Sequence, residues 1–378
     1  MKWRAEEYLL TPSQRAAEPL PMWVADMDFL APAPVREALR EVAEFGVYGY
    51  PAPVSSSYLD AVASWQHRRH GYEVDPEWIV PTSGVIAALK VAVQVFSSPG
   101  DSILLQPPVY GHFRDDVESN GRRPVYAPLR LEGDRYLFDP DGFERALRPD
   151  TRLFILSNPH NPTGNVWSSE DLRLMGEICL EHDVLVIADE IHQDFVLTAE
   201  RRHVPFASLD PRFAQGSITC TSASKTFNLA GLQVANTLIA QPSLRGRFLG
   251  QLERNQFSLL NLFGTVATEV AYREGEEWLD ALLDYLRESH ARFREVVNSL
   301  GVLRALPMDS LYLAWVDARG TGLEAEDLQD FLITRAGVWF DHGPKFGTEG
   351  RGFVRANLGC PRATLDVALE RLTKAFAS

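Results

Sequence analysis

Lys225 lies in the stretch TSASKTF, residues 221–227, directly after an apolar run typical of a buried strand. Lysine is rare in this chain, because only five of its 37 basic residues are lysines. An arginine keeps its proton near neutral pH, whereas a buried lysine amine can lose it and form a Schiff base with a carbonyl. An exposed lysine in a serine-rich turn is the alternative interpretation.

Asp189 ends another apolar run, VLVIAD. A carboxylate at a strand end can hold a pyridine nitrogen protonated and make the ring an electron sink, although a loop or cap acid is the plainer interpretation. Asp189 also forms an oxygen-rich set with Glu190, His192 and Asp194, a pattern that can bind metal. No second histidine or cysteine cluster completes that set, so we predict no metal site here.

Ser83, Gly84 and Val85 precede an apolar helical stretch in PTSGVIAALKVAV. The exposed backbone amides of a helix N-terminus bind phosphate readily, but many helices begin after serine and glycine only for capping. Gly84 and Val85 are therefore candidate phosphate ligands, with simple capping as the alternative.

Three further residues can contact a flat, anionic ligand. Asn161, in NPHNPTG, precedes a proline and can direct its amide at a ligand, although a simple loop is the alternative. Tyr110, in PPVYGHF, can stack on a flat cofactor or belong to the core. Arg355, in GFVRANLG, shares a strand face with Phe353 and Asn357 and can grip a carboxylate bidentately or form an ordinary salt bridge.

The elements that carry these residues alternate between short apolar runs and helical patterns, as in a mostly parallel sheet covered by helices. Four runs predict buried strands, at residues 102–106, 152–157, 184–188 and 217–221. A polar loop follows each run, and open α/β sheets bind ligands at the carboxyl ends of their strands. We expect an α/β fold with these loops at one edge, and a crossover helix over SSEDLRLMGEICLEH.

A length of 378 residues exceeds what one hydrophobic core usually supports, so we expect two lobes. From about residue 275 the sequence changes to a long helical segment, then SLYLAWVD, a helix near 323–336 and FVRANLG, a pattern typical of a smaller α/β lobe. We expect residues 36–275 to form a large domain, and residues 1–35 and 276–378 to form an N-terminal arm and a small domain.

The net charge and the cysteine content limit the classes of binding partner and the compartment that we expect. The net charge is −14 and the cations are scattered, which disfavours nucleic acid and anionic membranes. Cys179, Cys220 and Cys360 are widely spaced in apolar or small-residue contexts, which favours reduced thiols. The N-terminus lacks a signal peptide's apolar segment, and no run is long enough to span a bilayer. We expect a cytoplasmic protein that binds a small molecule.

One cofactor requires a buried lysine, a strand-end acid, a phosphate turn, a stacking tyrosine and a carboxylate-binding arginine together. That cofactor is pyridoxal phosphate. A dinucleotide is disfavoured, because no G-x-G-x-x-G follows an early strand.

Motifs along essentially the whole chain resemble those of one family. They are MWVADMDF, VYGYP, PTSGVIAAL, QPPVYGHF, NPHNPTGNVW, ADEIHQD, TSASKTFNLAGLQ, GEEWLDALLDYL, YLAWVD and GFVRANLGCPR. The chain resembles the fold-type I pyridoxal-phosphate enzymes, of aspartate-aminotransferase architecture, within the class I/II aminotransferase superfamily. Among these it is most similar to the MalY/PatB-type cystathionine β-lyases, also called cysteine-S-conjugate β-lyases.

The resemblance implies a role for each residue around the cofactor ring and the substrate. Lys225 would form the Schiff base, Asp189 would contact the pyridine nitrogen, and Asn161 the phenolic oxygen. Tyr110 would stack on the ring, and Arg355 would bind the substrate α-carboxylate.

The resemblance also implies how the phosphate is held and how the chain assembles. Gly84, Val85 and Ser222 would bind the phosphate from within one chain. Tyr50, in the YGY sequence, would reach the phosphate of the neighbouring subunit, so a homodimer is implied.

Two positions are similar to the lyases rather than to typical aminotransferases. His192 stands three residues after Asp189, where aminotransferases usually have tyrosine, and Gln233 stands where many have a phosphate-binding arginine. Two segments differ from the family pattern: the pair Ser310 and Leu311, and the stretch 339–342. Both are expected to border the substrate side of the cleft.

We therefore expect a β-lyase that cleaves cystathionine or another cysteine S-conjugate by α,β-elimination into a thiol, pyruvate and ammonia. An aminotransferase shares the first half of that chemistry and remains an alternative. A biosynthetic enzyme acting on a bulky S-conjugate is another, and a regulatory binding protein with the same fold and cofactor is a third.

Overall fold

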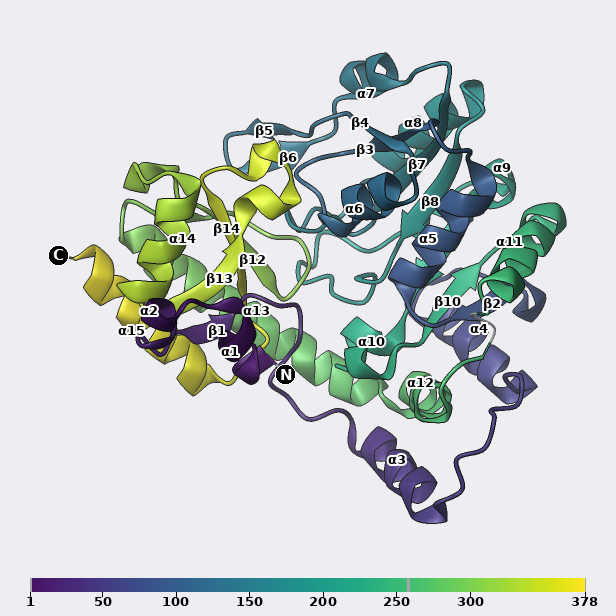
Figure 1. The fold of residues 1–378 in the computed structure, drawn as a ribbon, viewed down its shortest axis with the longest axis horizontal. Coiled ribbons are helices and arrows are strands. Elements are labelled where there is room, and N and C mark those ends of the chain that lie inside the picture. The colour runs from purple at the N-terminus through teal and green to yellow at the C-terminus, as the bar shows by residue number, and fades with distance from the viewer. Residues whose placement is uncertain (1, 257–258, 378) are drawn as a thin grey trace.

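The computed structural model describes residues 2–256 and 259–377. The predicted domain ranges also include positions 1, 257–258 and 378, which lie outside the described residues. Two sheets, each covered by helices, lie side by side, and the long helix α13 (Glu276–Ser299) extends from the side of the larger sheet to the smaller one (Figure 1).

The larger sheet contains the four strands predicted from the apolar runs, and these are neighbours in space. Its spatial order is β2 (Ile79–Thr82), β10 (Ala235–Leu238), β9 (Ser217–Thr221), β8 (Leu185–Asp189), β7 (Thr151–Ser157), β3 (Ser102–Leu105) and β4 (Arg123–Tyr126). The strands from β9 to β4 are parallel, whereas β10 is antiparallel to both β9 and β2. The predicted convergence of loops at the carboxyl ends of neighbouring strands is confirmed.

Apolar side chains cover both faces of this sheet, which explains why its strands read as continuous apolar runs. On β7, Phe154 and Leu156 belong to one core cluster, and Leu153 and Ile155 belong to another. The second cluster is completed by α5 (Val85–Phe96), which packs across the sheet. The crossover helix α8 (Ser169–Glu181) begins with a capping box at Ser168, as its sequence predicted.

The smaller sheet brings the two ends of the chain together. Its order is β1 (Leu20–Met22), β13 (Val338–His342), β14 (Phe353–Asn357), β12 (Leu313–Asp317) and β11 (Arg304–Ala305). It is covered by α13, α14 (Ala325–Thr334) and α15 (Arg362–Phe376). Alternation along β14 puts Val354 and Ala356 into this sheet's core and leaves Arg355 on the side facing the larger sheet.

The remaining elements complete the cover or connect the two sheets. The helices are α1 (Glu6–Leu9), α2 (Pro12–Arg15), α3 (Ala33–Phe45), α4 (Ser56–His70), α6 (His112–Ser119), α7 (Pro140–Ala146), α9 (Pro211–Gln215), α10 (Ala223–Thr226), α11 (Pro242–Arg254) and α12 (Leu262–Glu274). Strands β5 (Arg130–Glu132) and β6 (Arg135–Leu137) form a hairpin. Within the described residues, every helix is too short or too polar to cross a membrane.

Candidate active site

A cavity of about 220 Å³ lies where the carboxyl ends of β7, β8 and β9 meet the N-terminus of α5 and the face of β14. It brings together eight residues proposed from the sequence: Gly84, Val85, Tyr110, Asn161, Asp189, His192, Lys225 and Arg355. Gln233 also lines it. Ser222 and Tyr50 lie outside this lining.

Lys225 lies on α10, a short helix that follows β9 and is capped by the Ser222 side chain. Its Nζ donates a hydrogen bond of 2.8 Å to the backbone carbonyl of Ala25, and the Tyr312 hydroxyl donates to the same carbonyl at 2.8 Å. Burial lowers the pKa of Lys225, outweighing the nearby carboxylates of Asp26 and Asp189. The amine therefore releases its proton more easily than an exposed lysine does.

Asp189 is the last residue of β8 and is held on one side only. Its Oδ1 accepts a hydrogen bond of 3.2 Å from the backbone N–H of Ile191, whereas nothing in the described part of the chain donates to Oδ2. Burial raises the pKa of Asp189 to about 7. A cation placed beside this carboxyl from within the cavity would lower that pKa, so the position suits a protonated ring nitrogen.

The N-terminus of α5 presents free backbone amides to the cavity, since residues 83–87 all line it. Gly84 is the N-cap, with φ of 124°, a conformation that side-chain-bearing residues rarely adopt. No side chain in the described part of the chain caps this end, and the first turn contains no acid. This donor set fits a phosphate group.

Ser222 contacts two residues that line the cavity, Val234 and Ser224. Its hydroxyl donates to the carbonyl of Val234 at 2.6 Å and accepts from the backbone N–H of Ser224 at 3.0 Å. Ser224, rather than Ser222, is among the lining residues.

Arg355 is buried and positioned by groups from three parts of the chain. Its Nη1 donates to Asn161 Oδ1 at 2.9 Å, and its Nη2 donates to Asp341 Oδ2 at 2.7 Å and to the Trp23 carbonyl at 3.3 Å. The guanidinium lies 4.7 Å from the centre of the Phe346 ring. Its buried Nε has no partner among the residues that the structure describes, which leaves a donor for a carboxylate ligand.

His192 and Tyr110 complete the polar lining. Burial, together with Lys225 and Arg355, lowers the pKa of His192 well below its ordinary value, so its ring stays neutral. Its Nδ1 is buried without a partner. Burial raises the pKa of Tyr110 to about 12, so its hydroxyl stays protonated.

The oxygen-rich set after β8 does not converge on one point. Asp189 lines the cavity, whereas Glu190 accepts hydrogen bonds from Asn158 at 3.1 Å and from the Phe206 backbone at 2.8 Å. Asp194 lies on the opposite side of the loop, 2.9 Å from His70 Nε2. No metal-binding group of histidine, cysteine and acidic side chains occurs within residues 2–256 and 259–377.

Two contributors to the site were not assigned a role from sequence. The Ala25 carbonyl fixes the lysine amine, and its only sequence signal is the motif MWVADMDF. Asp341 pairs with Arg355 and lies in the stretch 339–342, which was expected to border the substrate side without a stated role. Both depend on contacts between segments more than 150 residues apart or on different strands, so local sequence patterns do not identify them.

Comparison with known proteins agrees with this architecture. Residues 21–372 match the family model described as "Aminotransferase class I and II". The chain is 43% identical over 360 residues to cystathionine beta-lyase PatB of Bacillus subtilis, covering 95% of this chain and 92% of that protein.

Two solved structures are similar over nearly the full length. A PLP-bound putative aminotransferase from Clostridium difficile superposes with a TM-score of 0.95 at 36% identity, covering 99% of this chain and 96% of that one. A PLP-bound C-S lyase from Staphylococcus hominis gives a TM-score of 0.90 at 33% identity, covering 99% and 94%. The matched range, the sequence identity and the shared fold establish that this chain belongs to the class I and II aminotransferase family.

Proposed function

We propose that this protein is a pyridoxal-phosphate-dependent C–S β-lyase that cleaves cystathionine or another cysteine S-conjugate. The observation that carries the proposal is one cavity holding a buried amine, a strand-end carboxyl, a free helix N-terminus and a buried arginine. The 43% identity to PatB, named a cystathionine beta-lyase, supports the choice of reaction.

The donor set of the cavity fits the cofactor group by group. The amides at the start of α5 would hold the phosphate, with Ser222 and Ser224 beside them. Lys225 would bind the aldehyde, Asp189 would face the ring nitrogen, and Tyr110 would lie against the ring. When bound, pyridoxal phosphate supplies an aldehyde that reacts with amines and a ring that accepts an electron pair.

The residues of the chain then bind the substrate and move its protons. Arg355 holds the α-carboxylate through its free Nε and the outer edge of its guanidinium. Once the substrate amine has taken the place of Lys225 at the aldehyde, the freed Lys225 amine, with its lowered pKa, would remove the proton from the substrate α-carbon. The β-carbon–sulfur bond breaks and the thiolate leaves with the bonding electron pair. Hydrolysis of the remaining aminoacrylate yields pyruvate and ammonia.

An aminotransferase is the second candidate, because the same cavity could return the proton to a carbon of the cofactor instead of expelling a thiolate. The neutral His192 and the uncharged Gln233 line the cavity, at positions where many aminotransferases have tyrosine and arginine. These two residues favour the lyase. A biosynthetic enzyme on a bulky S-conjugate remains within the same reaction class.

The proposal includes a homodimer in which Tyr50 reaches the partner subunit's phosphate site. Tyr50 is 94% exposed and lies between α3 and α4, near the exposed side chains of Phe45, Val47 and Tyr48. Such a group of exposed apolar side chains favours an interface. Light scattering should give twice the chain mass, and Tyr50→Phe should retain the cofactor less tightly. A monomeric holoenzyme would contradict this assignment.

Two further parts of the proposal concern organisation and location. We assign residues 36–275 to the large cofactor-binding domain, and the N-terminal arm with residues 276–378 to the small one. A cytoplasmic location is supported by the buried free thiols of Cys179, Cys220 and Cys360, which have no need of an oxidising compartment.

The reaction is tested by incubating the purified holoenzyme with cystathionine without any added keto acid. Pyruvate and a free thiol should appear in equal amounts. Strict dependence on a keto acid would identify an aminotransferase instead, and absence of turnover on a broad panel of amino acids and S-conjugates would reject the enzymatic proposal.

A further inference from the structure

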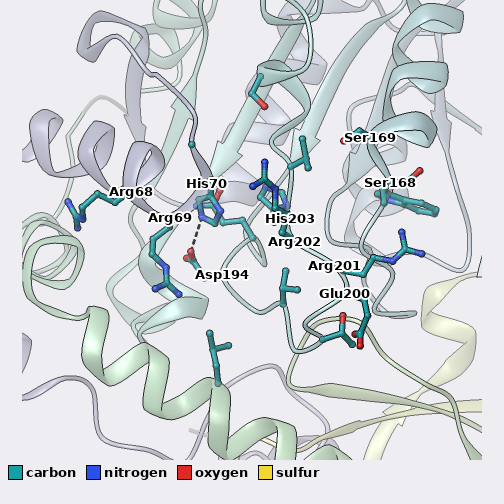
Figure 2. A pocket seen from close by; sticks show the side chains of 18 of the residues that line it. Arg68, Arg69, His70, Ser168, Ser169, Asp194, Glu200, Arg201, Arg202 and His203 are labelled. Atoms are coloured by element: carbon teal, nitrogen blue, oxygen red, sulfur yellow. Dashed lines mark hydrogen bonds and ion pairs between the residues drawn. The ribbon is translucent and has the colours of Figure 1, made fainter.

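A second cavity, of about 1060 Å³, lies behind the loop that follows β8 (Figure 2). Its walls come from the end of α4, the loop at 193–209, the start of α8 and the first half of α13. No described residue lines both cavities, yet the two share one wall, because Asp189 and His192 line the first cavity while Gln193 and Asp194 line the second.

Arginine dominates the lining of this second cavity. Its cations are Arg68, Arg69, Arg173, Arg201, Arg202 and Arg287, and its acids are Asp194, Glu200, Glu276 and Asp280. The cavity therefore concentrates positive charge in a chain whose net charge is −14.

Most of the acids in this lining are already paired. Arg69 lies 3.3 Å from Glu276 and 2.9 Å from Asp280, and Asp194 lies 2.9 Å from the His70 ring. Figure 2 shows the His70–Asp194 pair in the wall between the end of α4 and the loop. Glu200 is therefore the one acid of this lining that forms no ion pair with a described residue.

Three lining arginines, by contrast, are exposed and have no ion pair with any described residue: Arg173, Arg201 and Arg202. Three unpaired cations against one unpaired acid leave an excess of positive charge. An anionic ligand with more than one charged group would balance it.

Buried polar groups in the same wall also lack partners. Gln193 is 2% exposed, and neither its amide nitrogen nor its amide oxygen makes a hydrogen bond with a described residue. His203 is 5% exposed; its Nε2 lies 3.1 Å from the acceptor Glu190, so Nε2 carries the proton and the unpartnered Nδ1 is an acceptor. Burying such groups unpaired is costly, so the wall is suited to a ligand that both donates and accepts hydrogen bonds.

We propose that this second cavity binds a phosphorylated small molecule of nucleotide size, with at least two negative charges and with hydroxyl or amino donors. Arg201 and Arg202 would contact the phosphates, while Gln193 and His203 would contact the neutral polar part. The volume is slightly larger than the roughly 300–1,000 Å³ typical of small-molecule sites, which suits a nucleotide better than a single phosphate.

The test is calorimetric titration of the holoenzyme, in which cofactor already occupies the first cavity, with ADP, inorganic pyrophosphate and adenosine. ADP should bind, with an affinity that falls as salt is added, because salt screens exposed charges. Pyrophosphate should bind more weakly and adenosine not measurably. No binding of ADP at millimolar concentration, or equal affinity for adenosine and ADP, would overturn the proposal.

Variants locate the binding. The double substitution Arg201→Ala/Arg202→Ala should weaken ADP binding by about tenfold or more, since the loss of about 1.4 kcal/mol corresponds to tenfold. The matched control is Arg335→Ala/Arg351→Ala, which removes two exposed arginines outside the cavity and should leave ADP affinity unchanged. ADP binding that is equal in the two double variants would place the site elsewhere.

The variant Gln193→Leu tests whether this side chain contributes to ADP binding without contributing to the stability of the fold. The amide has no protein partner to lose, so the variant should unfold at the same temperature as the unaltered protein or higher, while binding ADP several-fold more weakly. A variant that binds ADP with unchanged affinity would remove Gln193 from the site.

Discussion

The two cavities on either side of the loop after β8 use charge in opposite ways. The first, of about 220 Å³, is lined by buried groups held at strand ends and at one helix N-terminus. The second, of about 1060 Å³, is lined by long and largely exposed arginines. Buried charges interact strongly and in fixed directions, whereas exposed charges are screened by water and salt. The first arrangement suits bond making and breaking, and the second suits the capture of an anion.

The difference lies in what holds each charged side chain. Arg355 is surrounded by Asn161, Asp341, the Trp23 carbonyl and the Phe346 ring, which come from three segments of the chain. Arg201 has no comparable support within the described residues. Substitutions in the first cavity should therefore change reactivity or stability strongly, and those in the second should mainly change affinity.

The largest effect is expected at Lys225. Lys225→Ala removes the amine that we propose binds the cofactor and takes the substrate α-proton, so pyruvate release should fall by about 10³-fold or more. The matched control, Lys374→Ala, alters a lysine whose side chain is 74% exposed on α15 and should keep full activity. The visible absorbance of the bound cofactor should change in the first variant only, and an unchanged spectrum would contradict the role of Lys225.

The second-largest effect is expected for Arg355→Ala. Loss of the desolvated cation that we propose binds the substrate carboxylate should reduce kcat/KM by about 2–5 kcal/mol in free-energy terms. Arg355→Lys keeps the positive charge but loses the planar fork, so its deficit should be smaller. Steady-state kinetics with a cysteine S-conjugate measure both values, and equal activity of Arg355→Ala would remove this residue from the site.

The raised pKa of Asp189 predicts that the stability of the apoprotein depends on pH. Burial raises its folded-state pKa from about 3.8 to about 7, so the folded form holds a proton that the unfolded form releases. Its contribution to stability is present at low pH and is lost as the pH rises from 4 to 7, by at most about 4 kcal/mol. Asp189→Asn cannot titrate, so the apoprotein of this variant should gain relative stability over that range. Urea unfolding measures the difference, and a constant difference would contradict the prediction.

The smallest effect is expected at Asp341. Asp341→Asn leaves Arg355 buried with less compensation, which should lower the free energy of unfolding by about 2 kcal/mol in the absence of substrate. A carboxylate-bearing substrate analogue would restore the compensation, so it should raise the melting temperature more in the variant than in the unaltered protein. Equal shifts in the two proteins would show that Asp341 does not affect carboxylate binding.

Much of the larger sheet followed from local pattern. The run 217–221 coincides with β9, and the runs 102–106, 152–157 and 184–188 match β3, β7 and β8 to within one residue at each end. A strand covered on both faces must be apolar throughout, so a continuous apolar run in the sequence indicates a buried strand. Strand β10 lies between β9 and β2 and is antiparallel to both. This arrangement was not predicted, because the direction of strand pairing depends on distant segments.

The sequence alone determined which residue types stand at the strand ends, since those are local properties of TSASKTF, VLVIADE and PTSGVIAAL, and it thereby indicated an amine, a carboxyl and a phosphate turn. Only the tertiary structure decided that the Ala25 carbonyl meets Lys225, that Asp341 meets Arg355, and that a second, arginine-lined cavity shares a wall with the first. Each of these contacts joins segments that are distant in the chain or on different strands. The Lys225 contact depends on the segment after β1 meeting α10, the Arg355 contact on the antiparallel pairing of β13 with β14, and the second cavity on how α4, α8, α13 and one loop come together. No short stretch of sequence encodes these arrangements.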